Sequence, residues 1–404
     1  MTLNRSSLTS HSAISANELD VAHLANCAGS TPFFAYGRAA IDARVRLLRA
    51  MLPASIHLHY SIKANPMPAL VHFLATRVDG FDVASASEMA LALNTGTAPN
   101  HIGFAGPGKT RDELRRAVAN GVNIHIESAT QLHLVAAIGW ELGIQPKIAI
   151  RVNPDFHVSH SGMRMGGGAA QFGVDAEQVP TLLAEMAARE VTLAGFHIFW
   201  GSQCLHAPTI ADAQRHSAEL AIRLASDLPS PPRYVNLGGG FGIPYFAGDT
   251  ALDLDAVVQP MHEWLARLQH ALPGVRPVLE LGRYLVGESG IYVCRIIDRK
   301  VSRGTTFLIT DGGLHHHLAA SGNFGQILRR NFPVVLGNRL NDAPLERCHI
   351  VGCACTPLDR IADDVLLPRA QIGDFVVVLQ SGAYARSASP RDFLGHPDAL
   401  EMLV

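Results

Sequence analysis

Short apolar segments alternate with longer amphipathic ones through the middle of the chain. Between about residues 56 and 285, eight segments rich in Val, Ile and Phe have the composition of buried strands. The stretches between them, such as 129–143 and 256–272, place apolar residues three or four positions apart, which predicts helices. The eight strand candidates are IHLHYSIKA, GFDVAS, HIGFAG, NIHIES, KIAIRVNP, LAGFHIFWG, YVNLGGGF and RPVLELGRYL.

This alternation constrains the fold class. Strands that are separated by helices pair in parallel, because each helix returns the chain to the same edge of the sheet. Eight such units predict a closed, TIM-like (β/α)8 barrel. An open, doubly wound sheet would give the same periodicity, so the pattern alone leaves it as the structural alternative.

The pattern changes after Leu285. Segments 290–313 and 373–387 are rich in Val, Ile and Thr, have turn residues between them and show few helical patterns, which indicates a β-domain. The isolated strand candidate at 33–37 is expected to join that domain. We therefore predict an α/β protein with a barrel over residues 38–286 and a β-domain made of residues 1–37 and 287–404.

Composition and charge exclude several classes of function. The 404 residues include 33 basic and 35 acidic side chains, and this net charge of −2 gives no field that would attract nucleic acid or an anionic membrane. No run of about 18 apolar residues predicts a membrane span. The first twenty residues lack the apolar core of a signal peptide, and the six scattered cysteines indicate reduced thiols, so we expect a cytoplasmic protein.

Residues 103–110 match the phosphate-loop pattern G-x-x-x-x-G-K-[ST], which suggests nucleotide binding as one hypothesis. Such a site also needs a carboxylate for Mg²⁺. The candidate, Asp311, lies about two hundred residues away in the predicted β-domain. We therefore expect Lys109 to be a solvated residue at the rim of the third strand–helix turn and not a nucleotide ligand.

The ends of the predicted strands place a consistent set of chemical groups at one face of the barrel. Active sites of such barrels gather at the carboxyl ends of the strands. Lys63 follows an apolar strand, where burial favours a free amine that can form a Schiff base. Gly238–Gly240, Ser202 and Arg283 can hold a phosphate, and Glu280 suits a cationic ring nitrogen. A lysine, a phosphate cradle and a carboxylate are what pyridoxal 5'-phosphate requires.

With these residues at the strand ends, and with eight motifs that are given below, the chain resembles the fold-type III pyridoxal-phosphate decarboxylases, the ornithine and diaminopimelate decarboxylase superfamily. The motifs appear in the family's order over more than nine tenths of the chain. The resemblance implies a cofactor-binding barrel with a β-domain, and a homodimer whose active sites lie at the subunit boundary. The matching motifs are YSIKAN, FDVASASEM, RVNP, GSQ, LGGGFG, ELGR, CTPLD and SGAY.

The resemblance also implies roles for the barrel residues. Lys63 would carry the cofactor, and Glu280 would keep its pyridine nitrogen protonated. Phe199 stands where relatives usually place a histidine over the ring, and an aromatic face can stack there as well. His197 either faces the same site or is a satisfied core histidine, and Asp82 either reaches the site or caps a helix. The implied phosphate ligands are Ser202, Gly238, Gly239, Gly240 and Arg283.

Further roles fall in the β-domain. By resemblance, Cys355 would enter the partner subunit's site and protonate the carbanion after carbon dioxide leaves. Tyr384 would reach the phosphate of the partner's cofactor, and Asp359 would lie near the substrate. A small buried thiol and a packed tyrosine are the structural alternatives for the first two.

Departures from the family pattern concern the substrate. Thr356 replaces the acidic residue that diaminopimelate enzymes carry after the cysteine, and Ala319–Ala320 replaces their Arg-Pro, so free diaminopimelate is not expected. Residues 311–326, CTPLD and the tail 387–397 resemble instead a subgroup of specialised metabolism and siderophore assembly that acts on carrier-bound or conjugated amino acids. His315, with its two histidine neighbours, is expected to line the substrate entry. No metal site is expected, because consecutive side chains diverge.

The sequence thus predicts α-decarboxylation of an amino acid, free or joined to an acyl-carrier protein or a larger conjugate. A decarboxylase of free ornithine, lysine or diaminopimelate is the first alternative. An amino-acid racemase of the same fold is a second, although such enzymes typically place arginine, and not a carboxylate such as Glu280, at the pyridine nitrogen. A non-enzymatic pyridoxal-phosphate-binding module is the third, and it usually lacks the β-domain.

Overall fold

The computed structural model describes residues 20–157, 163–340 and 342–404. The chain forms two compact units, which are treated separately below. One contains residues 48–243 and 250–282, and the other contains the remaining described residues. In the described part of the chain, no helix has both the length and the apolar character that crossing a bilayer requires. The predicted absence of a signal peptide concerns residues that lie mostly outside the described ranges.

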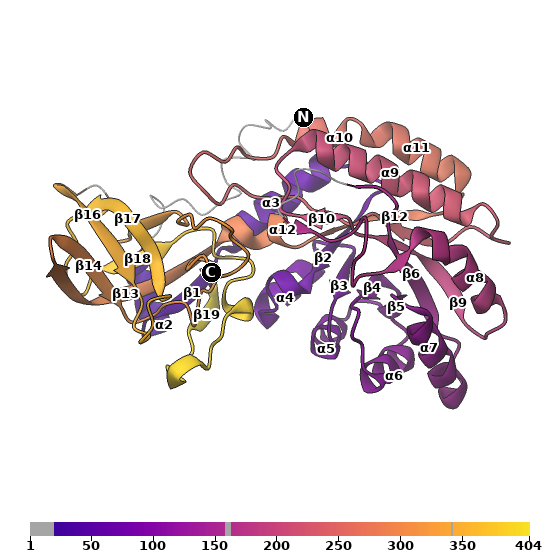
Figure 1. Ribbon diagram of the computed structural model, residues 1–404, viewed down its shortest axis with the longest axis horizontal. Helices are drawn as coiled ribbons and strands as arrows, with labels where there is room; N and C mark the ends of the chain where they lie inside the picture. Colours follow the sequence, from indigo (N-terminus) through magenta and orange to yellow (C-terminus); the bar gives the residue numbers. More distant parts are fainter. Residues whose placement is uncertain (1–19, 158–162, 341) are drawn as a thin grey trace. The chain divides into compact units, whose positions relative to one another are not determined.

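The first unit is a closed parallel barrel (Figure 1). Each strand pairs in parallel with the next in the chain, β12 pairs with β2, and the contact between β5 and β6 completes the ring. This closure confirms the predicted (β/α)8 barrel and excludes the open sheet. The eight strands are β2 (His57–Ser61), β3 (Gly80–Val83), β4 (Ile102–Phe104), β5 (Asn123–Ile126), β6 (Lys147–Asn153), β9 (Thr192–Ile198), β11 (Tyr234–Asn236) and β12 (Arg276–Leu281).

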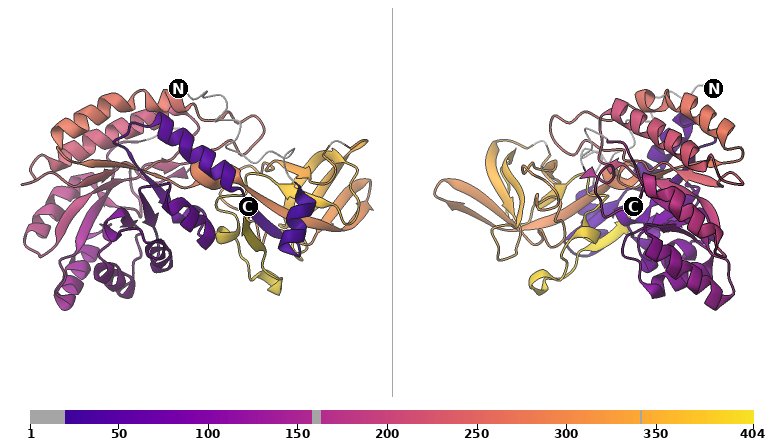
Figure 2. Two further views of the ribbon diagram at one scale, coloured as in Figure 1. Left: turned by 180° about the vertical axis from the view of Figure 1, so that it is seen from behind. Right: turned by 45° about the vertical axis from the view of Figure 1, so that its right-hand side comes forward.

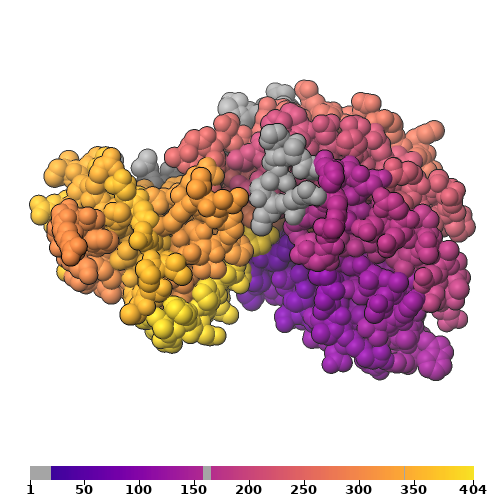
Figure 3. Space-filling view, in the orientation of Figure 1, coloured from indigo at the N-terminus to yellow at the C-terminus, as the bar shows by residue number. Residues whose placement is uncertain are grey.

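Helices form the outer layer of the barrel (Figure 1), whose purple and magenta segments lie at the surface in the space-filling view of Figure 3. Several begin where a Ser or Thr side chain caps the first turn. Thr110 and Glu113 form a reciprocal capping box at α6. The helices are α4 (Pro68–Ala75), α5 (Ala86–Asn94), α6 (Arg111–Asn120), α7 (Ala129–Leu142), α8 (Val179–Ala187), α9 (Ala207–Ala225), α10 (Leu254–Val258) and α11 (Met261–Ala271), with α3 (Arg38–Met51) leading into the barrel.

Short strands and 3-10 turns lie in the segments that connect the longer elements. The 3-10 turn η2 (Ile62–Ala64) follows β2, and β8 (Val174–Asp175) extends beside the end of β6. A two-residue ladder joins β7 (Met163–Arg164) to β10 (Gly201–Ser202). The remaining 3-10 turns are η3 (Pro99–His101), η4 (Ala176–Gln178), η5 (Gly287–Ser289), η6 (Arg386–Ala388) and η7 (Phe393–Gly395).

The interior of the barrel is unusually polar. Such barrels are normally filled by layers of Val, Ile and Leu. Here the side chains that meet inside include histidines, carboxylates and amides, and they leave a small cavity with room for about one water molecule. The cavity is lined by His57, His59, Asp82, Asn100, Gly103, Asn123, His125, Tyr234, Asn236, Arg276 and Val278.

The second unit contains an eight-stranded sheet. The long strand β13 pairs with β1, β14 and β18, and β1 pairs in parallel with β19 at the end of the chain (Figure 2). The strand candidate at 33–37 therefore joins the β-domain, as predicted. The elements are α2 (Val21–Ala28), β1 (Phe33–Tyr36), α12 (Arg283–Val286), β13 (Gly290–Ser302), β14 (Thr305–Thr310), β15 (Val334–Leu336), β16 (Leu345–Val351), β17 (Arg360–Pro368), β18 (Phe375–Val378) and β19 (Leu400–Leu403).

The lysine of the phosphate-loop pattern is a buried structural residue. Lys109 is 8% exposed, and its Nζ donates to Gly106 O at 2.6 Å, His125 O at 2.7 Å and Gln131 Oε1 at 3.1 Å. The ammonium group therefore ties the β4–α6 turn to strand β5 and helix α7. The expectation of a solvated rim residue was wrong, because a buried lysine can direct all its donors to protein oxygens.

Substituting this lysine should destabilise the barrel in a pH-dependent way. Lys109→Met removes three hydrogen bonds and should lower the free energy of unfolding by about 2 kcal/mol near pH 7. Burial lowers the pKa of Lys109 to about 8. Between pH 8 and the unfolded-state pKa, the unfolded chain binds more protons than the folded one, so native stability rises with pH. The deficit of the variant should therefore grow above pH 8.

Urea unfolding of both proteins at several pH values measures this effect. Lys147→Met, which changes an exposed lysine at the start of β6, is the matched control and should show no such trend. A Lys109→Met deficit that is absent, or that shrinks above pH 8, would contradict the assignment.

Candidate active site

Lys63 lies where strand β2 ends and enters the turn η2. The flanking Ile62 and Ala64 are buried, so the backbone at this point is held by the barrel core. The Lys63 side chain is half-buried, and its Nζ lies 5.4 Å from the centroid of the Phe199 ring. The structure thus brings together the predicted cofactor lysine and the predicted stacking residue, which are far apart in sequence.

The glycine-rich turn after β11 packs closely against neighbouring backbone. A side chain at Gly239 would place Cβ 2.1 Å from Glu280 O, and one at Gly240 would meet Trp200 and Gly201 O at under 3 Å. Gly240 also has a φ of 76°, which disfavours residues with a side chain. These contacts explain why the turn needs glycine, and this turn, here called the cradle, is the segment that we expect to offer backbone N–H groups to a phosphate.

The turn after β9 is fastened to the glycine-rich turn. Gln203 Nε2 donates to Ile243 O at 2.6 Å, and Ile243 N donates back to Gln203 Oε1 at 3.2 Å. Cys204 N donates to Gly240 O at 2.9 Å. The bonds therefore hold Ser202, a predicted phosphate ligand, in a turn that is locked to the cradle.

Glu280 lies buried on β12 beside an amide and a histidine. Asn236 Nδ2 donates to Glu280 Oε2 at 3.0 Å, and His197 Nε2 lies 3.4 Å from the same oxygen. Burial disfavours ionisation of Glu280, but His197 together with the charges of Lys63 and Arg151 outweighs it, and the pKa of this carboxyl is lowered. An ionised carboxylate near Lys63 is the group that would keep a pyridine nitrogen protonated.

Asp82 contacts the barrel network and does not cap the following helix. Its Oδ2 lies 3.0 Å from His59 Nδ1, and its Oδ1 accepts from Asn236 Nδ2 at 3.3 Å. Ser85 caps helix α5 instead. Of the two interpretations of Asp82 in the sequence, the structure therefore favours the one that places it near Glu280.

In the second unit, Arg283 and Tyr384 lie against each other. The Arg283 guanidinium carbon is 4.6 Å from the centroid of the Tyr384 ring, and its Nη1 donates to Tyr245 Oη at 2.8 Å. The Arg283 Nε is buried and has no hydrogen-bond partner among the described residues, so one donor remains for a ligand. Tyr384 therefore packs on Arg283 of its own chain, and its predicted reach to the phosphate of the partner's cofactor stays a prediction.

The loop between β16 and β17 presents Cys355 and buries Asp359. Cys355 is exposed, and Thr356 is half-buried beside it. The carboxylate of Asp359 accepts from Leu314 N at 2.6 Å and Ala354 N at 2.8 Å, and this residue is 3% exposed. Asp359 therefore shapes the loop from within, which differs from the substrate contact that the sequence suggested.

The three consecutive histidines are buried in the β-domain. Burial lowers the pKa of His315 to about 4 and that of His317 to about 3, so both are neutral near pH 7. His316 bonds Tyr292 and Pro397, and His317 bonds Ser381. Neither ring nitrogen of His315 has a partner among the described residues. The predicted place of His315 at the substrate entry stays a prediction.

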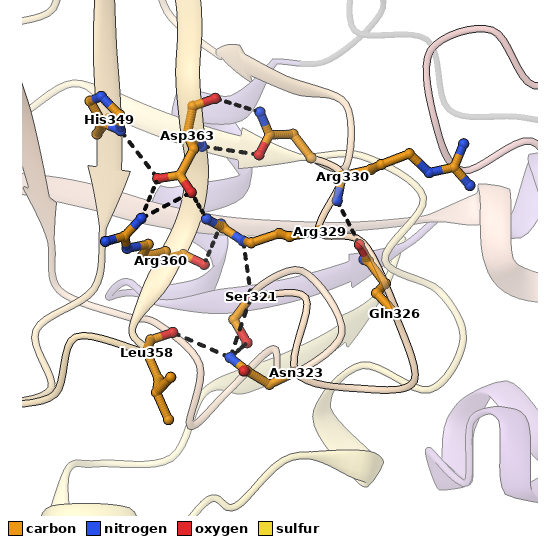
Figure 4. A network of polar contacts seen from close by, with 10 residues as sticks. Ser321, Asn323, Gln326, Arg329, Arg330, His349, Leu358, Arg360 and Asp363 are labelled. Carbon is orange, nitrogen blue, oxygen red and sulfur yellow. Dashed lines mark hydrogen bonds and ion pairs between the residues drawn. The ribbon is translucent and has the colours of Figure 1, made fainter.

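The segment after the histidines folds back onto β17 and the Cys355 loop (Figure 4). Arg329 forms an ion pair with Asp363 and donates to Ser321 O at 3.0 Å, while Asn323 Nδ2 contacts Leu358 O at 3.3 Å. Two sequence segments that were singled out as unusual, 311–326 and CTPLD, are therefore neighbours in space.

Sequence reasoning missed several polar residues of the barrel interior. Asn236, His59 and His125 were read only as members of strands. Their signal is the alternation of polar and apolar residues in IHLHYS and NIHI, which is unexpected for strands that are covered on the outside by helices. Arg151, the first residue of the motif RVNP, received no role from the sequence, and it pairs with buried Glu127 at 3.1 Å.

Comparison with known proteins agrees with this site. Residues 38–287 match a family model described as pyridoxal-dependent decarboxylase, pyridoxal binding domain. The chain is 35% identical to the Niallia circulans L-glutamyl-[BtrI acyl-carrier protein] decarboxylase, with 92% of this chain and 88% of the relative covered. It is 30% identical to the Staphylococcus aureus 2-[(L-alanin-3-ylcarbamoyl)methyl]-2-hydroxybutanedioate decarboxylase, with 90% and 92% covered.

A solved structure supports the fold. Diaminopimelate decarboxylase from Helicobacter pylori, complexed with L-lysine, superposes with a TM-score of 0.83 at 24% identity, covering 95% of this chain and 94% of the other. Three observations agree on the family of this chain: the closed barrel, the placement of Lys63 and Glu280 on it, and the matches to known proteins. The chain belongs to the fold-type III pyridoxal-dependent decarboxylases, and pyridoxal phosphate is its cofactor.

Proposed function

We propose that the chain removes the α-carboxylate from an amino acid that is joined to a larger acyl body. The observation that carries the catalytic part is the ionised, buried Glu280 near Lys63 at the carboxyl end of the barrel. A carboxylate at this position favours decarboxylation over racemisation, because it keeps the ring of the cofactor strongly electron-withdrawing.

Lys63, Phe199 and Glu280 each have a different proposed role toward the cofactor, which follows from where each residue lies in the barrel. When bound, pyridoxal phosphate supplies a ring that accepts the electrons left at Cα when carbon dioxide departs. Lys63 would hold the cofactor covalently through its side-chain amine. Phe199 presents an aromatic face beside Lys63, and Glu280 holds a proton on the ring nitrogen through its negative charge.

Phosphate binding combines backbone and side chains. The cradle at Gly239 and Gly240 offers close approach to main-chain N–H groups, and Ser202 adds a hydroxyl from the turn that is locked to it. Arg283, whose Nε has no hydrogen-bond partner among the described residues, would add positive charge, and Tyr384 stacks on its guanidinium.

A homodimer would complete the site with Cys355. Ile327 is fully exposed and Leu328 is 81% exposed, and both belong to the segment that Asn323 joins to the Cys355 loop. Exposed apolar residues of this kind favour a protein contact. In the dimer that we propose, the thiol of Cys355 lies in the partner's site and gives its proton to the carbon that has lost carbon dioxide.

The substrate assignment follows from the departures and from the relatives. Thr356 and Ala319–Ala320 offer no charged group for a distal ammonium or carboxylate. The names of two relatives describe amino acids joined to larger bodies, one to an acyl-carrier protein and one through a carbamoyl link. A tethered substrate also needs no charge recognition at its far end.

The free cysteines, all six unpaired, support the expected cytoplasmic setting.

The first prediction concerns cofactor attachment. Lys63→Ala should lose the visible absorption band of the lysine-bound cofactor and all decarboxylation, because no other amine lies at the end of β2. Borohydride reduction followed by peptide mass spectrometry should find the cofactor on Lys63 in the parent enzyme. Lys147→Ala is the control and should behave like the parent. An unchanged band in Lys63→Ala would remove the assignment.

The second prediction concerns protonation. Cys355→Ser should keep the band but lower turnover by roughly 10²-fold or more, because a hydroxyl is a far weaker acid than a thiol at neutral pH. Cys27→Ser, which changes another exposed thiol, should be silent. Unchanged turnover and product in Cys355→Ser would show that another group delivers the proton.

The third prediction concerns the substrate. Carbon dioxide release should be fastest with an acidic amino acid tethered to a carrier protein or with an amide-linked conjugate, and slow with free ornithine, lysine or diaminopimelate. Assays of a substrate panel at equal concentration give the kcat/KM ratios directly. Comparable or higher kcat/KM for a free diamino acid would overturn the tethered-substrate proposal while leaving the decarboxylase intact.

A further inference from the structure

Two buried carboxylates on different strands share one amide inside the barrel. Asn236 Nδ2 donates to Glu280 Oε2 at 3.0 Å and to Asp82 Oδ1 at 3.3 Å. Both acids are 6% exposed, and Asn236 is 1% exposed. Two negative charges this close in a water-poor interior repel each other strongly, so such a pair tends to retain a proton.

The orientation of the shared amide is fixed by the backbone. Gly238 N–H can only donate, and it donates to Asn236 Oδ1 at 2.9 Å. The oxygen of the Asn236 amide therefore faces the glycine-rich turn, and its NH2 group faces both carboxylates. Each acid receives one of the two amide protons, so the amide itself does not decide which acid is ionised.

The surroundings of the two acids differ in charge. Glu280 has His197 at 3.4 Å and feels the charges of Lys63 and Arg151, whereas the groups that lower the pKa of Asp82 are His59, at 3.0 Å, and His197. Burial and the charge of Glu280 raise the pKa of Asp82, while the cations lower that of Glu280. The titratable and charged groups that face the pair are His59, Lys63, His125, Arg151, His197 and Tyr234.

His197 is fixed by a second chain of contacts. Its Nδ1 lies 3.0 Å from His125 Nδ1, and His125 Nε2 lies 2.8 Å from Tyr234 Oη. Burial and the neighbouring charges lower the pKa of His125 well below its usual value, so His125 is neutral. Because a neutral His125 can accept at Nδ1 while its Nε2 bonds Tyr234, His197 can donate to it from Nδ1, and the Nε2 of His197 lies 3.4 Å from Glu280 Oε2.

We propose that Asp82 is a positioning residue that retains the proton of the Asp82–Glu280 pair, so that Glu280 alone carries the negative charge presented to the cofactor's ring nitrogen. This inference rests on the proposed function for the role of Glu280. In this arrangement the Asp82 hydroxyl donates to His59 Nδ1, and its carbonyl oxygen accepts from Asn236. The alternative is an ionised Asp82 that pairs with a protonated His59.

The two arrangements make opposite predictions for a neutral isostere. The amide of Asp82→Asn can donate to His59 and accept from Asn236, as a protonated acid does, so this variant should keep its turnover within about threefold of the parent and an unchanged pH profile. Asp82→Ala should weaken cofactor binding and shift the pH profile. Glu280→Gln should lower turnover by roughly 10²-fold or more. If Asp82→Asn is as impaired as Glu280→Gln, the protonated state is wrong.

Infrared spectroscopy of the full-length holoenzyme tests the proton directly. With carboxyl-labelled aspartate incorporated, the parent protein at neutral pH should show the carbonyl stretch of a protonated aspartic acid, and Asp82→Asn or Asp82→Ser should lack it. Absence of that band in the parent, or its persistence in both variants, would overturn the inference. The infrared band is measured without turnover. A chain that decarboxylates no substrate would therefore contradict the proposed function but would leave the protonation state of Asp82 to be decided by the band.

Discussion

The ionised carboxylate of Glu280, buried inside a closed barrel, is the constraint on which the rest of the site depends. A charge in a water-poor interior is costly unless opposite charges and hydrogen bonds compensate it. The pairing of β5 with β6 closes the ring around the interior, where Glu280 is 6% exposed. Asn236, His197 and the charges of Lys63 and Arg151 supply the compensation. The polar filling of the barrel follows from this need.

The same constraint organises the loops above the strands. Asn236, which bonds Glu280, also fixes the first residue of the glycine-rich turn through Gly238 N–H. That turn is locked to the one after β9, where Ser202 follows Phe199. The carboxylate, the phosphate cradle and the aromatic face are therefore linked through short paths of hydrogen bonds. A change at Asn236 would disturb them together.

Much of the fold was predictable because it follows from periodicity. Strand–helix alternation specifies a parallel sheet, and the count of units specifies closure. The change of pattern after Leu285 marked the β-domain, and strand 33–37 joined it. Lys63 and Glu280 were predicted because the carboxyl ends of barrel strands meet at one face, and Phe199 was predicted from its place in the family pattern. These are regularities that act within a single element or between neighbouring ones.

What sequence could not supply is the partnering of polar groups across the barrel. Lys109 matched a phosphate-loop pattern, yet its three acceptors lie on segments that only the fold brings together. Because Asp82 precedes a helix, the sequence allowed a helix cap as well as a site residue. Its contact with Asn236 joins two residues that are 154 positions apart. The carboxylate of Asp359 accepts hydrogen bonds from two backbone amides within the β-domain. Such contacts depend on register and turn geometry, which composition does not encode.

The central claim is that Glu280 holds the ring nitrogen of the cofactor in its protonated form. The nitrogen-15 chemical shift of ring-labelled pyridoxal phosphate, bound to the full-length enzyme, measures this protonation directly. The account predicts the shift of a protonated nitrogen throughout the neutral pH range, and its loss in Glu280→Gln. An unprotonated nitrogen in the parent enzyme, or a protonated one that survives the substitution, would contradict the account.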